Sequence, residues 1–76
     1  MTRLPVLSGR ELAKAMGRLG YDFDHQRGSH ITLRHREPPH RRLTIPDHDE
    51  IAKGTLRAIL REAGIGLDEL LGLLGR

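Results

Sequence analysis

The chain has 76 residues, which predicts one small domain with a core over about residues 8–65 and a short C-terminal helix within 66–76. It contains no cysteine, so disulfide frameworks, thiolate nucleophiles and cysteine-ligated zinc are excluded. Thirteen Lys and Arg against ten Asp and Glu give a formal net charge of +3, and no apolar run reaches the length of a membrane span. We therefore expect a cytoplasmic protein whose partner is not a membrane.

The first predicted elements are a helix and a strand. Ser8-Gly9-Arg10-Glu11 has the pattern of a capping box, and apolar residues then recur at helical spacing, which predicts a helix from about Gly9 to Arg18. Gly20 ends this helix, and residues 21–26 alternate between apolar and polar as a half-buried strand does. Residues 27–29 then predict a turn.

Two further strands follow the turn. The second is predicted from His30 to His35 and the third from Arg41 to Ile45, with a break at residues 37–40 and with Pro46 at the end of the sheet. Strand side chains alternate between the two faces of a sheet. The predicted outer face therefore carries His30, Thr32, Arg34, Arg36, Arg42 and Thr44.

The C-terminal part predicts two helices. One begins at Lys53-Gly54-Thr55, carries an apolar stripe and ends at Gly64, and a short one starts at Leu67. The order α-β-β-β-α plus a C-terminal helix predicts an α+β fold, in which a three-stranded antiparallel sheet has the helices on one face. The expected core is Leu12, Met16, Leu19, Tyr21, Phe23, Ile31, Leu33, Leu43, Ile45, Leu56, Ile59 and Leu60.

Nucleic acid is the partner class that the charge pattern favours. The middle of the sequence holds five arginines with Glu37 as the only acid among them: Arg27, Arg34, Arg36, Arg41 and Arg42. Arginine suits phosphate contacts, whereas an ordinary solvated surface is the alternative interpretation. The amides of Lys53-Gly54-Thr55 offer a second phosphate site, or are simply a helix start. Because Tyr21 and Phe23 are expected in the core, base stacking is not predicted.

His30 is the candidate acid or base. It follows Gly28-Ser29 at the start of the second strand, and an imidazole both takes and gives a proton near neutral pH. A solvated surface histidine is the alternative. A metal site in Asp47-His48-Asp49 is the weaker hypothesis, and the histidines spaced five apart cannot converge on one ion because His30 and His35 fall on opposite faces. We expect no metal and no small-molecule cofactor.

Taken together, these residues resemble the HicA (YcfA-like) family of small toxins over nearly the whole chain from Ser8 to Leu71. The similarity rests on Gly28-Ser29-His30, Thr44-Ile45-Pro46-Asp47-His48 and Lys53-Gly54-Thr55-Leu56, with the segment around Ala63-Gly64-Ile65. The resemblance implies a double-stranded-RNA-binding-domain-like fold and the toxin component of a type II toxin-antitoxin system that acts in stress response. It further implies an mRNA interferase, a ribosome-independent endoribonuclease, that a cognate HicB-type antitoxin neutralises by covering the active face.

The resemblance also places the family's catalytic histidine on His30. This chain departs from the commoner pattern at Ile31, where a second polar residue or histidine often stands, and in the acidic loop at 47–50. The acidic loop leaves the role of His48 open.

The expected chemistry is metal-independent cleavage of RNA. It requires a base for the 2′-OH proton, positive charge for the phosphorane and an acid for the leaving 5′ oxygen. We predict that His30 is the acid or base and that Ser29 and Thr32 orient the imidazole or the phosphate. The predicted RNA and phosphate contacts are Arg27, Arg34, Arg36, Arg42, Lys53, Gly54 and Thr55, with Arg34 and Lys53 stabilising charge. The sequence offers no evident second acid.

Two other functions stay open from the sequence. One is a non-catalytic RNA-binding module of the same fold, although the loop at 27–29 is short for a reader of duplex RNA, which usually needs a long loop to cross the minor groove. The other is an interaction subunit whose basic face docks an acidic protein.

Overall fold

The elements follow the predicted order α-β-β-β-α with an additional C-terminal helix. A computed structural model describes residues 3–75, so residues 1, 2 and 76 of the expected domain lie outside the described residues. The elements are α1 (Gly9–Gly17), β1 (Tyr21–Arg27), β2 (His30–His35), β3 (Arg42–Pro46), α2 (Lys53–Ala63) and α3 (Leu67–Leu73). None of the helices within the described residues is both long and apolar enough to cross a membrane.

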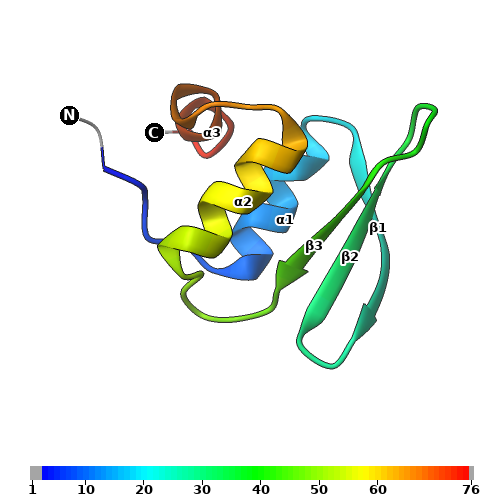
Figure 1. Ribbon diagram of the computed structural model, residues 1–76, viewed down its shortest axis with the longest axis horizontal. Coiled ribbons are helices and arrows are strands. Elements are labelled where there is room, and N and C mark those ends of the chain that lie inside the picture. The colour runs from blue at the N-terminus through cyan, green and yellow to red at the C-terminus, as the bar shows by residue number, and fades with distance from the viewer. Residues whose placement is uncertain (1–2, 76) are drawn as a thin grey trace.

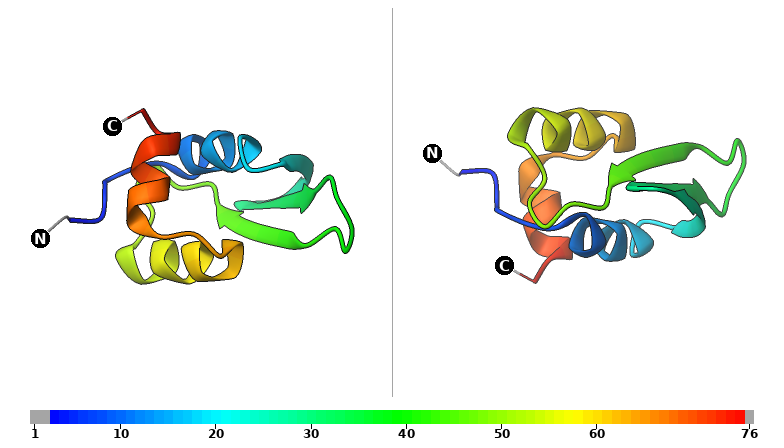
Figure 2. Two further views of the ribbon diagram at one scale, coloured as in Figure 1. Left: turned by 90° about the horizontal axis from the view of Figure 1, so that it is seen from above. Right: turned by 90° about the horizontal axis from the view of Figure 1, so that it is seen from below.

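The sheet is an antiparallel meander in the order β1-β2-β3. Helices α1 and α2 lie on one side of it, with α1 packed against β1 and β3 and α2 against β3 (Figure 1). Helix α3 crosses the two longer helices on the side away from the sheet (Figure 2). No described segment covers the opposite face of the sheet in these views, which confirms that the helices occupy a single face.

Local sequence signals fix the start of α1 and the end of α2 as predicted. The hydroxyl of Ser8 accepts a hydrogen bond from the Glu11 backbone N–H at 3.1 Å, and the Glu11 carboxylate accepts one from the Ser8 backbone N–H at 3.0 Å. This reciprocal capping box satisfies two N–H groups that have no partner inside the helix. Gly64 ends α2 in the left-handed conformation, with φ +72°, which costs glycine little because it has no Cβ.

The core is close to the predicted set. Ten of its twelve predicted members are buried, and Leu19 packs against the core while partly exposed. Four buried apolar residues lie outside the predicted set, namely Leu7 before α1, Ala15 on α1, Ile51 before α2 and Leu70 on α3. Leu7 and Ile51 come from connecting segments, where sequence spacing carries no signal. The element ends also shift slightly, since α1 ends at Gly17, one residue before the predicted Arg18, and β3 begins at Arg42 and includes Pro46.

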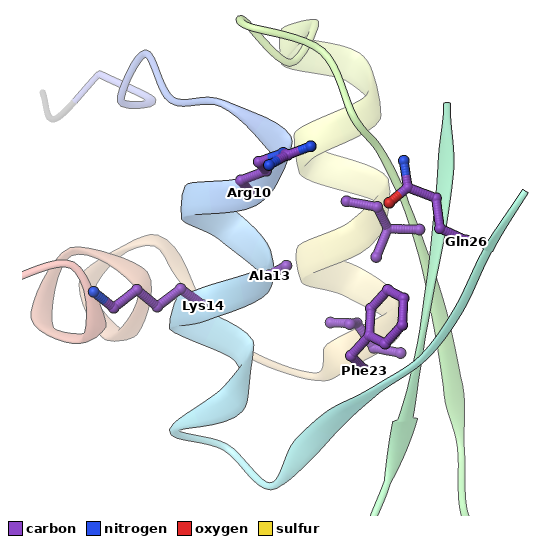
Figure 3. Close-up of a pocket in the computed structure, with 7 residues that line it drawn as sticks. Arg10, Ala13, Lys14, Phe23 and Gln26 are labelled. Atoms are coloured by element: carbon purple, nitrogen blue, oxygen red, sulfur yellow. The ribbon is translucent and has the colours of Figure 1, made fainter. Parts of the chain in front are cut away.

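Phe23 is the one predicted core residue that the structure contradicts, because it is 65% exposed. Its side chain is on the helix side, as the pairing of Phe23 with Leu33 requires. However, β1 is an edge strand, and α1 lines the groove opposite with Arg10, Ala13 and Lys14, none of which is a large apolar side chain. Phe23 therefore lines an open groove of about 400 Å³ between α1 and β1 instead of filling a closed core (Figure 3).

Candidate active site

The β1–β2 hairpin places His30 at the rim of the sheet. Arg27 and His30 are paired across the end of the hairpin, and Gly28 and Ser29 form its two-residue loop. Gly28 is the first loop residue and has φ +58°, a conformation that tight hairpin loops require there and that glycine adopts without strain. The predicted turn is confirmed but is one residue shorter, because Arg27 belongs to β1. His30 is exposed as the first residue of β2.

Asp47 ties this hairpin to α1. Its backbone N–H donates to the Ser29 carbonyl at 2.7 Å, and its carboxylate accepts from Arg10 Nε at 3.2 Å and from Gln26 Nε2 at 3.0 Å. The hydrogen bonds from Arg10 and Gln26, together with the charge of Arg10, hold the pKa of the Asp47 carboxyl below its ordinary value. Gln26 also donates to the Gly28 carbonyl, so Asp47 connects α1, β1 and the hairpin loop beside His30.

A close backbone contact supports the same end of the sheet, where the hairpin lies next to the start of α1. The Gly9 N–H donates to the His48 carbonyl at 2.9 Å, and a Cβ at position 9 would lie 1.9 Å from the Pro46 carbonyl oxygen. Only glycine permits this approach. Pro46 is the last residue of β3 and the cross-strand partner of His30. The start of α1 therefore lies directly behind the end of β3 that is paired with His30.

The outer face brings together most of the predicted site residues. Thr32 pairs with Thr44, and Arg34 pairs with Arg42, in register with His30 opposite Pro46. Side chains of directly paired residues share a face. The arginines and Thr44 are exposed, Thr32 is half-buried, and within residues 3–75 no group hydrogen-bonds the His30 imidazole.

Arg36 is engaged at the far end of the sheet. Its guanidinium donates to the carbonyls of Gly17 at 3.1 Å and Gly20 at 3.3 Å, and it lies 3.5 Å from the Asp22 carboxylate. These contacts tie β2 to the end of α1. Of the predicted phosphate contacts on the sheet, Arg36 is therefore the one whose donors already have protein acceptors.

Lys53, Gly54 and Thr55 are not on this face. They form the exposed first turn of α2, which lies in the helix layer and is separated from the hairpin by loop 47–52 (Figure 1). The N-cap, Ala52, makes no side-chain capping hydrogen bond. The predicted second phosphate position is thus a separate surface from the one around His30.

An irregularity in the pairing of β1 with β2 places a further histidine, His25, on the outer face beside the carboxylate of Asp24. Phe23 pairs with Leu33 but His25 pairs with Thr32, so Asp24 is the extra residue of a β-bulge. The bulge reverses the alternation and turns His25 to the outer face. Its Nδ1–H donates to the Asp24 carboxylate at 2.9 Å.

The remaining histidines include two with clear structural contacts. His35 is on the helix side, donates from Nε2 to the Leu19 carbonyl at 2.9 Å and stacks edge-on against Tyr21 with ring centroids 4.8 Å apart. His40 lies in the β2–β3 connection and donates from Nδ1 to the His35 carbonyl. The predicted placement of His30 and His35 on opposite faces is confirmed. Among the described residues, no group of three or more His, Cys, Asp or Glu side chains is arranged to hold a metal ion.

Comparison with known protein families gives one match. Residues 9–65 match the family described as HicA toxin of bacterial toxin-antitoxin, which is more than half of the chain and contains every element of the hairpin and its supports. A search of curated proteins finds no match.

Proposed function

The chain belongs to the HicA family of toxins from bacterial toxin-antitoxin systems, and on that premise we propose that it is an endoribonuclease that cleaves mRNA without a metal ion. The observation that carries the proposal is the position of His30. Its imidazole stands at an exposed strand end whose backbone is braced by Asp47, on a face that also carries arginines. An exposed imidazole on a braced backbone, beside cations, is suited to proton transfer at a phosphodiester.

His30 takes the proton of the 2′-OH in this proposal, and Arg27 stabilises the charge on the reacting phosphate. Arg27 is the direct cross-strand neighbour of His30. Arg34 is four residues further along β2, about 13 Å at the rise of a strand, so its guanidinium meets a neighbouring phosphate. Ser29 and Thr32 flank His30 and orient the imidazole or the phosphate by hydrogen bonding.

The rest of the outer face binds the RNA backbone. Arg34 and Arg42 are exposed cross-strand partners near the middle of the sheet. Because Phe, Tyr and Trp are absent from this face within the described chain, the contacts are ionic ones to phosphate and not stacking on bases. Lys53, Gly54 and Thr55 form a second phosphate contact at the start of α2.

The cognate HicB-type antitoxin covers the same outer face. Membership of a toxin-antitoxin family implies such a partner. An inhibitor of a basic, open sheet must meet its charge with acidic groups or exclude RNA by its bulk.

The deciding experiment compares wild type with His30→Ala. We expect the wild type to cleave mRNA in vitro in excess EDTA and to arrest growth when expressed, and His30→Ala to do neither while its far-UV circular dichroism is unchanged. His40→Asn is the matched control, because it removes an imidazole at the opposite end of the sheet.

Three outcomes would oppose the proposal. A folded His30→Ala protein that still cleaves RNA refutes the role of the histidine. Loss of activity in EDTA that added metal restores indicates a metal site instead. RNA binding by the wild type without any cleavage favours the non-catalytic module.

A further inference from the structure

The proposed reaction needs a second proton-transfer group that His30 does not provide. When the 2′ oxygen forms a bond to phosphorus and the bond from phosphorus to the 5′ oxygen breaks, the leaving oxygen must gain a proton. His30 has just accepted the proton of the 2′-OH. A separate acid on the other side of the phosphate would protonate the leaving group in the same step.

The bulge in β1 supplies a group of the right kind in the right place. His25 pairs with Thr32, and His30 is two residues before Thr32 on the same face of β2. The two imidazoles are therefore diagonal neighbours, with Cα atoms about 7–8 Å apart in such a pair. This spacing leaves room for a phosphate between them, and Arg27 lies on the same face beside both.

We propose that His25 is the general acid of this site and that Asp24 positions its imidazole. The inference rests on the proposed function. In the reaction, His30 receives the 2′-OH proton, the 2′ oxygen attacks phosphorus, and the Nε2–H of the His25 imidazolium protonates the leaving 5′ oxygen. The products are a 2′,3′-cyclic phosphate and a 5′-hydroxyl end, and no oxidant or further reactant is needed.

The contact between Asp24 and His25 suits this role. Asp24 accepts from Nδ1 at 2.9 Å, which leaves Nε2 directed away from the carboxylate, and the imidazole is 59% exposed where a substrate reaches it. The hydrogen bond from His25, with the charges of Arg42 and Arg34, holds the pKa of the Asp24 carboxyl below its ordinary value, so this group is an anion at neutral pH. The contact at Nδ1 fixes the ring and leaves Nε2 as the nitrogen that faces a substrate.

Other ionisable groups face His25 from each neighbouring segment. Arg27 is on its own strand, His30 and Arg34 are on β2, and Arg42 is on β3. Asp24 is in direct contact with the imidazole, so its replacement is the most direct test of how the ring is held.

The test uses two RNA oligonucleotides that differ at one atom. The first is an ordinary substrate, and the second carries a 5′-thio group at the scissile phosphate mapped with wild type, because sulfur leaves without being protonated. His25→Ala and His25→Gln should cleave the ordinary RNA roughly 10²–10⁴ times more slowly than wild type. Both should cleave the thio substrate at a rate close to that of wild type. His25→Gln keeps an N–H donor for Asp24, which separates the loss of the proton from the loss of the contact.

Asp24→Asn tests the positioning role separately. Without the carboxylate that holds Nδ1, kcat on ordinary RNA should fall while the rate on the thio substrate stays close to that of wild type, and Asp24→Glu, which keeps a carboxylate, should recover part of the lost rate. His40→Asn should match wild type throughout. An unchanged kcat on ordinary RNA, or an equal loss on both substrates, would overturn the role of Asp24.

The outcomes separate this inference from the function on which it rests. His30→Ala should be inactive on both substrates, since the attacking oxygen still needs a base. If His30→Ala is inactive but the His25 variants cleave ordinary RNA at the wild-type rate, the assignment of His25 is wrong and the endoribonuclease proposal stands. Equal losses on both substrates would also overturn the general-acid role. If wild type cleaves neither substrate, the proposed function itself fails.

Discussion

Removal of Arg34 and Arg42 should flatten the salt dependence of RNA binding. The two side chains are exposed cross-strand partners on the open face of the sheet. Each arginine that contacts a phosphate displaces condensed cations from the RNA, and this displacement makes the affinity fall as salt rises. The measurement is best made in a His30→Ala background, in which the proposed cleavage cannot remove the ligand.

The size of the effect follows from the number of contacts. If Arg27, Arg34 and Arg42 each contact one phosphate of a single strand, the sheet face contributes roughly −2 to the log-log slope, at about −0.7 per contact. Through these contacts, affinity should fall about 18-fold between 50 and 200 mM salt. With Arg34 and Arg42 both replaced by Ala, one contact of the sheet face remains, and its share of the loss over the same change of salt should be only about 2.6-fold.

Fluorescence anisotropy of a labelled single-stranded RNA gives these slopes directly. Arg57→Ala and Arg61→Ala are the matched controls, because both arginines are exposed on α2 and away from the open sheet face. If Arg34→Ala and Arg42→Ala leave the slope unchanged, the basic face is only solvated surface. If the helix substitutions flatten the slope equally, the salt dependence reflects the overall charge of the protein and not contacts at this face.

The same variants test whether the antitoxin and the RNA share a surface. Arg34→Ala and Arg42→Ala should each weaken antitoxin binding, because an acidic inhibitor loses a charged partner. If RNA affinity falls while antitoxin affinity stays fixed, inhibition acts from another part of the molecule.

Two further predictions concern stability. Leu33→Ala should lower the free energy of unfolding by about 2–5 kcal/mol, but Phe23→Ala by only about 1 kcal/mol, because Leu33 is 2% exposed whereas its larger cross-strand partner is 65% exposed. Urea unfolding followed by circular dichroism measures both, and the reverse order would contradict the burial described for β1. Asp47→Asn should lower the thermal midpoint near pH 6. The pKa of Asp47 is below its ordinary value of 3.8 in the folded protein, so its contribution is present above about pH 4 and disappears as pH falls through the folded value. A difference in midpoint that persists unchanged well below pH 3.8 would contradict this linkage.

Much of the fold is predictable because its signals are local. The hydrogen bonds of Ser8 and Glu11 close within four residues, and Gly28 and Gly64 occupy positions where the backbone itself requires glycine. Such features need no knowledge of the rest of the chain. Alternation also places His30 and His35 on opposite faces, since β2 is regular throughout.

The β-bulge at Asp24 is the feature of the site that sequence reasoning does not predict. Strict alternation from Tyr21 puts His25 on the same side as Phe23, facing the helices. One extra residue reverses the side, but whether a strand contains one depends on pairing with β2 and not on its own composition. For the same reason, the sequence alone offers no second acid. The exposure of Phe23 is also non-local, since it depends on the short side chain of Ala13 across the groove.

The two faces of the sheet have different roles, and this determines whether a substitution tests stability or chemistry. The buried side chains of β2 and β3, Ile31, Leu33, Leu43 and Ile45, all point toward the helices, so the outer side chains contribute little to the core. His25 and His30 stand on that outer face, while the contacts that hold their hairpin come from Asp47 and the start of α1 behind it. Substitutions of either histidine therefore test chemistry in a folded protein, and substitutions of Asp47 test how firmly the hairpin must be held for that chemistry to proceed.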